Sequence, residues 1–206
     1  MLTKRKFLAG LAASTMLPSI GNTHKDDYVL PEEFLPREVR LKTKLEPGEI
    51  HVDPSGYALY WTMPKRKAIR YTIGIGRGNL YHPGEFFVGA KREWPSWRPT
   101  PDMMQRSPNS YIDFLEGGRY ENGQPGGEHN PLGARALYLY TVTSRRDSYL
   151  RIHGTNAPRT IGIEVSNGCA RLVNEQVALL YQQVPIGTRV VLYPKPGAGP
   201  AHKEIH

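Results

Sequence analysis

The segment from Tyr149 to Leu172 holds the only cysteine of the 206-residue chain, Cys169, and a histidine, His153, sixteen positions before it (169 minus 153). The five residues that end at His153 alternate between polar and apolar side chains, which predicts a strand. A glycine and a Thr-Asn-Ala-Pro sequence follow, and both are typical of a turn. The chain can therefore turn back after the strand and bring Cys169 close to His153.

This arrangement predicts a catalytic cysteine. A free thiol has a pKa of about 8.5, so it needs a base to take its proton near neutral pH, and the imidazole of His153 can do so. Gly168 allows a close backbone approach just before Cys169, where N–H groups can stabilise a developing oxyanion. The alternative is that Cys169 is a small buried hydrophobe and His153 a structural residue at a strand end.

The same residues also carry a family resemblance. The sequence Ile152-His153-Gly154-Thr155-Asn156, then Gly162, then Ser166-Asn167-Gly168-Cys169-Ala170-Arg171-Leu172 resembles the L,D-transpeptidase catalytic domain of the YkuD type, in its ErfK/YbiS group. The pattern of that family is HGT followed by S/T-x-G-C-x-R. Weaker similarity extends back to about Gly48, so the likeness covers most of the chain.

The resemblance implies roles for these residues. It makes Cys169 the nucleophile and His153 the base, with the carbonyl of Gly154 orienting the imidazole ring. It places Asn167 and Gly168 in the oxyanion region, although many members have a histidine where Asn167 stands.

Four further residues are candidates for substrate binding. Arg171 either binds a substrate carboxylate with both guanidinium nitrogens or holds its own loop in place. Thr155, Asn156 and Ser166 are expected to shape the pocket rather than to take part in the chemistry.

The fold implied by the resemblance is mainly β: a compact β-sandwich of mixed sheets with a helix after the catalytic cysteine. The implied substrate is a peptidoglycan tetrapeptide stem, which loses its terminal D-alanine and forms a thioester with the enzyme. An amine then resolves the thioester, from another stem or from an envelope protein, without a cofactor or metal. The alternatives are an L,D-carboxypeptidase or cysteine amidase, which would use water, and a non-catalytic wall-binding module.

The first 21 residues read as a signal peptide. Three basic residues, Lys4 to Lys6, precede an apolar run from Phe7 to Leu17 that is too short to span a bilayer. Small residues at Ser19 and Gly21 suit a cleavage point. The pattern predicts export to the periplasm or cell envelope, by the general secretory or the twin-arginine route.

The charge of the chain limits its partners. The formal net charge is +8, and it falls to +5 without the three basic residues of the leader. This balance suits peptidoglycan or an anionic membrane surface, or reflects a scattered basic surface. Nucleic acid is not expected, because the basic residues do not form a stripe with interleaved aromatic residues.

Beyond the leader, the expected organisation is an extended lead-in at 22–45, a catalytic domain at 46–194 and a loose tail at 195–206. Alternation and turn residues predict strands in the following ranges: 50–52, 57–63, 68–75, 86–89, 136–142, 149–153 and 188–193. Asn174 is expected to cap a helix that runs to about Val184, with one apolar face.

Two segments between the strands have open interpretations. The Trp94–Pro99 segment either packs across a groove or forms a rigid buried loop, and Thr100 is expected to cap a short helix after it. The glycine-rich segment Gly117–Gly133 is irregular and is either a flap over the site or a surface loop. His129 within it has no accompanying ligand pattern, so we expect no metal.

Overall fold

The computed structural model describes residues 28–197 and residue 205, so the predicted signal peptide at 1–21 lies outside the described residues. A meander of three antiparallel strands begins the sheet: β2 (Ile50–Asp53), β3 (Ala58–Met63) and β4 (Lys67–Thr72). These are strands that the sequence predicts. β3 is apolar on both faces, with Leu59 and Trp61 in the main core and Ala58 and Tyr60 in a second cluster. Short polar turns connect the three strands.

Nine strands form one mixed sheet in the order β1-β4-β3-β2-β11-β6-β7-β8-β10. The pairs β11–β2 and β10–β8 are parallel, and the other pairs are antiparallel. The remaining strands of this sheet are β1 (Arg37–Arg40), β6 (Gly84–Glu93), β7 (Arg135–Thr141), β8 (Asp147–His153), β10 (Ala170–Arg171) and β11 (Arg189–Leu192). A second, two-stranded sheet pairs β5 (Ile75–Gly76) with β9 (Glu164–Ser166). The mainly β fold with mixed sheets is confirmed.

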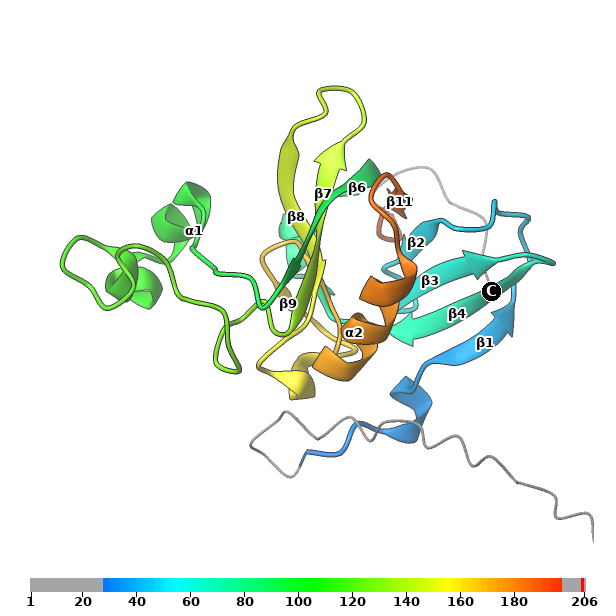
Figure 1. Cartoon of the computed structure of the whole chain (residues 1–206), viewed down its shortest axis with the longest axis horizontal. Helices are drawn as coiled ribbons and strands as arrows, with labels where there is room; N and C mark the ends of the chain where they lie inside the picture. Colours follow the sequence, from blue (N-terminus) through cyan, green and yellow to red (C-terminus); the bar gives the residue numbers. More distant parts are fainter. Residues whose placement is uncertain (1–27, 198–204, 206) are drawn as a thin grey trace, which may run out of the picture.

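The helix expected after the cysteine is α2 (Asn174–Gln183), which crosses the sheet in Figure 1. Val177, Leu180 and Val184 on its apolar face are fully buried in the main core. The predicted capping role of Asn174 is wrong, because Val173 holds the N-cap position and no side chain caps the helix. The side chain of Asn174 instead accepts hydrogen bonds from two neighbouring loops.

Both ends of the described chain are tied to the sheet. The lead-in expected at 22–45 contributes β1, which pairs antiparallel with β4. Ile205, in the tail expected to be loose, is only 2% exposed and accepts a hydrogen bond from the backbone of Lys42. Lys195 forms an ion pair of 2.6 Å with Glu164. The sequence missed these contacts because each of them joins segments far apart in the chain.

Residues 94–133 form a lobe that extends from the sheet on the left of Figure 1. It contains α1 (Pro101–Arg106) and the 3-10 helix η3 (Pro108–Phe114), and Thr100 caps α1 as predicted. Trp97 packs edge-on against Phe114, and its backbone pairs with that of Gln124. Three shorter 3-10 helices lie elsewhere: η1 (Glu32–Phe34), η2 (Gly78–Leu80) and η4 (Pro158–Thr160). In the described part of the chain, no helix has the length and apolarity needed to cross a membrane.

Candidate active site

The parallel pairing of β10 with β8 brings the candidate catalytic residues together. Ala170 lies opposite Ile152, and Arg171 lies opposite His153. Successive side chains of a strand point to opposite faces of the sheet. One face of this pair is buried in the core, through Leu150, Ile152, Ala170 and Leu172. The other face presents Arg151, His153, Cys169 and Arg171.

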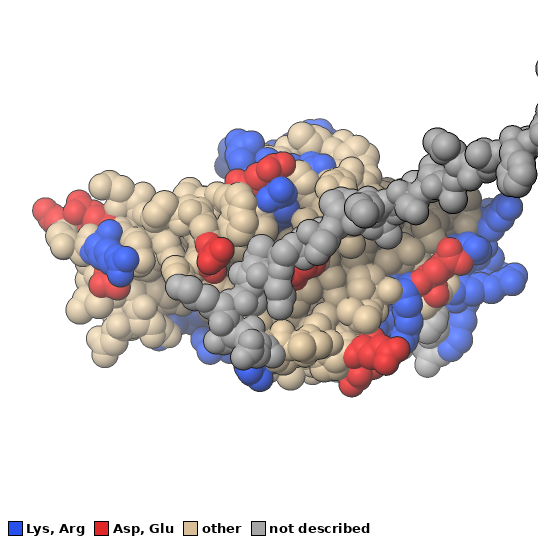
Figure 2. All heavy atoms as spheres, turned by 60° about the horizontal axis from the view of Figure 1, so that its bottom comes forward, with Lys and Arg blue, Asp and Glu red and all other residues tan. Residues whose placement is uncertain are grey.

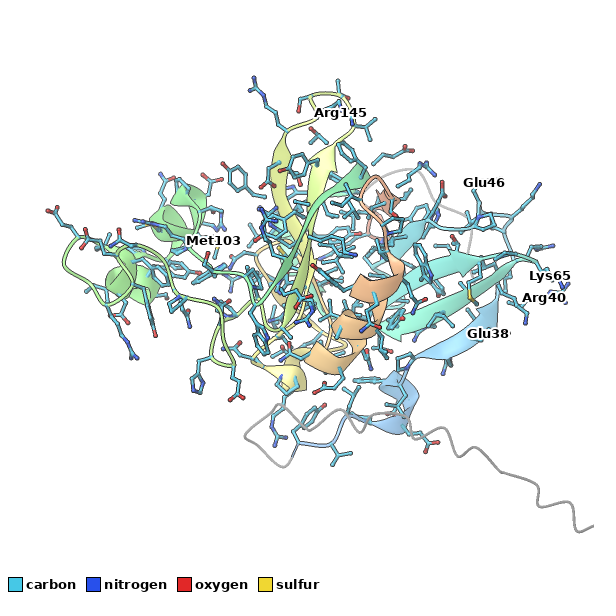
Figure 3. All side chains as sticks on the ribbon, in the orientation of Figure 1. Glu38, Arg40, Glu46, Lys65, Met103 and Arg145 are labelled. Atoms are coloured by element: carbon cyan, nitrogen blue, oxygen red, sulfur yellow. The ribbon has the colours of Figure 1, made fainter. Side chains whose placement is uncertain are left out.

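A pocket of about 810 Å³ lies between this face and the lobe. Cys169 and His153 line it from the sheet side. Trp97, Met103 and Arg106 line it from the lobe, and Figure 3 labels Met103 on that side. Asn122, Gly123, Pro131 and Leu132 also belong to its wall. The glycine-rich segment 117–133 therefore contributes these four residues to the pocket wall.

His153 is held in one orientation. Its ring is 4% exposed, and Nδ1 lies 2.6 Å from the carbonyl oxygen of Gly154. A carbonyl oxygen can only accept, so Nδ1 carries the proton and Nε2 of the neutral ring is left as an acceptor. Burial lowers the pKa of His153 to about 3, although the Gly154 carbonyl favours the protonated ring.

The thiol of Cys169 has a similar environment. Burial raises the pKa of Cys169, while a hydrogen bond from the Arg151 backbone and the charges of Arg151 and Arg171 act in the opposite direction. Both shifts favour the uncharged form of the group, a neutral thiol at Cys169 and a neutral imidazole at His153. Burial therefore disfavours a thiolate and an imidazolium in the resting protein.

The loop before Cys169 is shaped by Ser166 and Gly168. The hydroxyl of Ser166 accepts the Gly168 N–H at 3.2 Å and donates to the Cys169 carbonyl at 2.7 Å. Gly168 has φ +125°, and a Cβ there would lie 2.8 Å from the carbonyl oxygen of Leu80. Any residue larger than glycine would therefore clash with the backbone of Leu80 and displace the loop that holds Cys169. The Gly168 N–H is already engaged within the loop, so it is not a free oxyanion donor in this structure.

Asn167 connects the loop to the lobe. Its side-chain oxygen accepts a hydrogen bond of 3.3 Å from the guanidinium of Arg106, at the end of α1. The sequence did not single out Arg106, because the two residues lie 61 positions apart and only the packing of the lobe brings them together.

The pocket wall is basic. Four arginines line it, at positions 98, 106, 151 and 171, whereas Asp102 is its only acidic lining residue. Asp147 neutralises Arg151 through two contacts of 2.6 and 2.7 Å. Arg171 donates to the Thr160 carbonyl at 3.4 Å, while its buried Nε has no hydrogen-bond partner. Both interpretations of Arg171 therefore remain open, since it holds a neighbouring loop and also faces the pocket.

The structure places Thr155 and Asn156 outside the pocket wall. Thr155 is fully buried, and its hydroxyl accepts the N–H of Ala157 at 3.0 Å. Asn156 donates to the His129 carbonyl at 3.1 Å and so joins the strand end to the lobe. Among the described residues, no group of three or more His, Cys, Asp or Glu side chains could hold a metal ion.

Asn174 is a supporting residue that the sequence assigned to another role. Its buried Oδ1 accepts the backbone N–H groups of Ala134, at 2.9 Å, and Thr155, at 3.3 Å. These bonds join Thr155, the residue after Gly154, to the segment at Ala134, and so support the loop whose Gly154 carbonyl orients His153. Gly133 packs so closely that an added Cβ would lie 2.2 Å from this oxygen.

We expect Asn174→Ala to lower the free energy of unfolding by about 3 kcal/mol, because two buried N–H groups would lose their acceptor. Chemical denaturation measures this change. Asn174→Asp keeps the oxygen acceptor and is the matched control, with a smaller loss. Equal losses in the two variants would contradict the role given to the oxygen.

The fold, and a pocket lined by both Cys169 and His153, define a class of protein: a mainly β domain with a candidate cysteine nucleophile. The sequence model of the L,D-transpeptidase catalytic domain, the YkuD family, matches residues 47–192. The chain belongs to this family.

Individual relatives agree with this membership. The chain is 32% identical over 180 residues to an Escherichia coli K12 protein named "Probable L,D-transpeptidase ErfK/SrfK", a match that covers 82% of this chain and 53% of the relative. The chain thus spans about half the length of the curated relatives it matches.

Solved structures share the fold. A Brucella melitensis crystal structure, described as a "Probable carnitine operon oxidoreductase", is 43% identical, with a TM-score of 0.52 over 80% of this chain and 96% of that one. A mutant of the Enterococcus faecium L,D-transpeptidase is 15% identical, with a TM-score of 0.50 over 72% of this chain and 50% of that one. The second similarity concerns the fold alone.

Proposed function

We propose that this protein is an L,D-transpeptidase that acts on peptidoglycan tetrapeptide stems through Cys169. The observation that carries the proposal is that His153, at the end of β8, and Cys169, directly before the parallel strand β10, line one basic pocket. Family membership supports the same activity.

In the proposed reaction, Nε2 of His153 takes the thiol proton as sulfur attacks the carbonyl carbon before the terminal D-alanine. The C–N bond then breaks, and the imidazolium returns the proton to the leaving D-alanine amine. The stem is left as a thioester on Cys169. An acceptor amine attacks this thioester, gives a proton to His153 and releases the sulfur, which is protonated again.

The pocket suits an anionic peptide. A tetrapeptide stem carries carboxylates, and the guanidinium groups of Arg106 and Arg171 face the space beside Cys169. Arg106 donates a hydrogen bond of 3.3 Å to the neutral side chain of Asn167, so a carboxylate could replace that weak contact. The backbone N–H of Arg151, which reaches the sulfur, is a nearby donor for the substrate oxyanion.

Two features bear on the acceptor. Water would give a carboxypeptidase, so a transpeptidase must hold an amine near the thioester and restrict water. The lobe, with Trp97 and the 117–133 segment, walls the side of the pocket opposite the sheet. We propose that it excludes water and holds the acceptor, either another stem or an envelope protein. Export to the periplasm or cell envelope, by the predicted leader, would put the protein with this substrate.

We expect incubation with a purified stem tetrapeptide to add a mass equal to the tetrapeptide minus D-alanine to Cys169. Intact-mass analysis measures the adduct, and Cys169→Ala is the control. Adding a diamine or a second stem should then give a cross-linked product in preference to the hydrolysed tripeptide. An acylated enzyme that yields only tripeptide would indicate a carboxypeptidase, and an absence of any adduct would support a non-catalytic module.

A further inference from the structure

The positive charge of the protein is concentrated in two short segments. Residues 37–44 and 64–67 together hold seven Lys or Arg and one acid, a net charge of +6 (7 minus 1). Residues 28–206 as a whole hold 23 Lys or Arg and 17 Asp or Glu, also +6 (23 minus 17). The rest of that range is therefore balanced, and the basic surface is not scattered.

The two segments form one surface, which we call the basic end. β1 pairs with β4 so that Arg40 lies opposite Lys67, and the backbone of Leu41 donates to the Arg66 carbonyl at 2.7 Å. Figure 3 shows Arg40 and Lys65 together at the right-hand end of the molecule, and Figure 2 shows Lys and Arg gathered there. All seven basic side chains are exposed: Arg37, Arg40, Lys42, Lys44, Lys65, Arg66 and Lys67.

Protection of the sheet edge explains only part of this surface. Charged residues on an edge strand such as β1 prevent pairing with other chains, which accounts for Arg37 and Arg40. Edge protection does not account for the basic residues of the β3–β4 turn. Lys65 and Arg66 have φ values of 62° and 58°, a left-handed conformation that glycine and asparagine adopt more easily. The turn thus carries two basic side chains where smaller residues would fit the backbone better.

The basic end lies opposite the candidate active site. β1 is the first strand of the nine-stranded sheet, whereas β8, which ends at His153, and β10, which Cys169 directly precedes, are its last two. None of the basic-end residues lines the pocket. Figure 1 shows β1 and β4 on the right and the lobe on the left.

We propose that the basic end binds the anionic phospholipid headgroups of a membrane surface. Its Lys and Arg side chains lie on a hairpin turn and an edge strand, so they can contact many headgroups at once. Docking by this end would leave the pocket facing away from the membrane, toward the cell wall. Only this orientation argument rests on the proposed function, because lipid binding itself needs no catalysis.

The test compares two variants of the full chain, purified with the same N-terminus. Lys65→Asn with Arg66→Gly removes two charges from the basic end and suits the left-handed turn, so the variant should fold at least as well as the parent. Arg145→Asn with Arg146→Gln removes two exposed charges from the β7–β8 turn, where Arg145 also has a positive φ of 54°. Figure 3 shows Arg145 at the top of the molecule, away from the basic end.

Binding is measured by sedimentation with vesicles of about three parts phosphatidylcholine to one part phosphatidylglycerol, on which each Lys or Arg strengthens binding about fivefold. We expect the Lys65/Arg66 variant to bind about thirtyfold more weakly and the Arg145/Arg146 variant less than about threefold more weakly. Raising the salt concentration should weaken parental binding, and pure phosphatidylcholine should not support it.

Equal weakening in both variants would overturn the proposal, because general charge would then explain the binding. So would a Lys65/Arg66 variant that binds vesicles normally but loses affinity for purified peptidoglycan, since the basic end would then be a wall-binding surface. Acylation of Cys169 by soluble tetrapeptide should be the same in both variants and the parent. Absence of acylation in all three proteins would count against the proposed function. The vesicle measurement would still test lipid binding, because lipid binding needs no catalysis.

Discussion

Replacing Cys169 with alanine should lower the turnover of a stem tetrapeptide by at least about 10⁴-fold, because the thiol that forms the proposed acyl intermediate is removed. Release of D-alanine measures the turnover. Cys169→Ser should lose nearly as much, since a hydroxyl holds its proton more tightly than a thiol and the buried imidazole is a weak base.

The loss must come from chemistry rather than from folding. Cys169 is a small, partly exposed side chain next to the core, so both variants should unfold within about 1 kcal/mol of the parent. They should also still bind the tetrapeptide, because the arginines of the pocket are unchanged. Normal release of D-alanine by Cys169→Ala would remove the cysteine from the mechanism.

The sequence was most informative where local pattern and chemistry coincide. Alternation before His153 predicts the strand β8, and the glycine before Cys169 predicts a close backbone approach, because both depend on neighbouring residues. The apolar face of α2 is also visible in the spacing of Val177, Leu180 and Val184. Each of these features lies within a single segment.

The sequence was least informative where a role depends on distant segments. Asn174 has the residue type and position of a helix cap, yet its oxygen is used by a backbone N–H group 40 positions away. β1 was expected as an extended lead-in, since only Val39 of its four residues is buried and no alternation is visible. Arg106 became a candidate only when the lobe placed it beside Asn167.

The pH dependence of the reaction should reveal the protonation state of the resting pair. The pKa of His153 is lowered to about 3, so its imidazole stays unprotonated as the pH falls from 7 to 5. We therefore expect kcat/KM to stay nearly constant over this range. A thiolate–imidazolium pair, or a histidine with an ordinary pKa near 6.5, would instead make kcat/KM change with pH in the acidic range. A tenfold fall per pH unit below about 6.5 would contradict the burial argument.

His153→Gln provides the second part of this test. It should lower kcat by about 10²- to 10⁴-fold, because the general base is lost while a side chain of similar size remains. The acylation that remains should then depend on hydroxide and rise with pH, as the thiol of Cys169 ionises without help. Imidazole added to the solution should restore part of the rate in a smaller variant, His153→Ala.

The lowered pKa of His153 also predicts that the free energy of unfolding changes with pH. The unfolded chain binds a proton at His153 below about pH 6.5, whereas the folded protein does not bind it until about pH 3. The free energy of unfolding should therefore fall as the pH is lowered through this window, by up to about 1.4 kcal/mol per pH unit for this group. His51, whose pKa burial also lowers, adds a dependence of the same sign.

Denaturation of the parent and of His153→Gln between pH 7 and pH 5 separates the two contributions, because only that of His51 remains in the variant. Identical pH dependence in both proteins would show that His153 titrates normally in the folded state and does not rest as the neutral base on which the proposed mechanism depends.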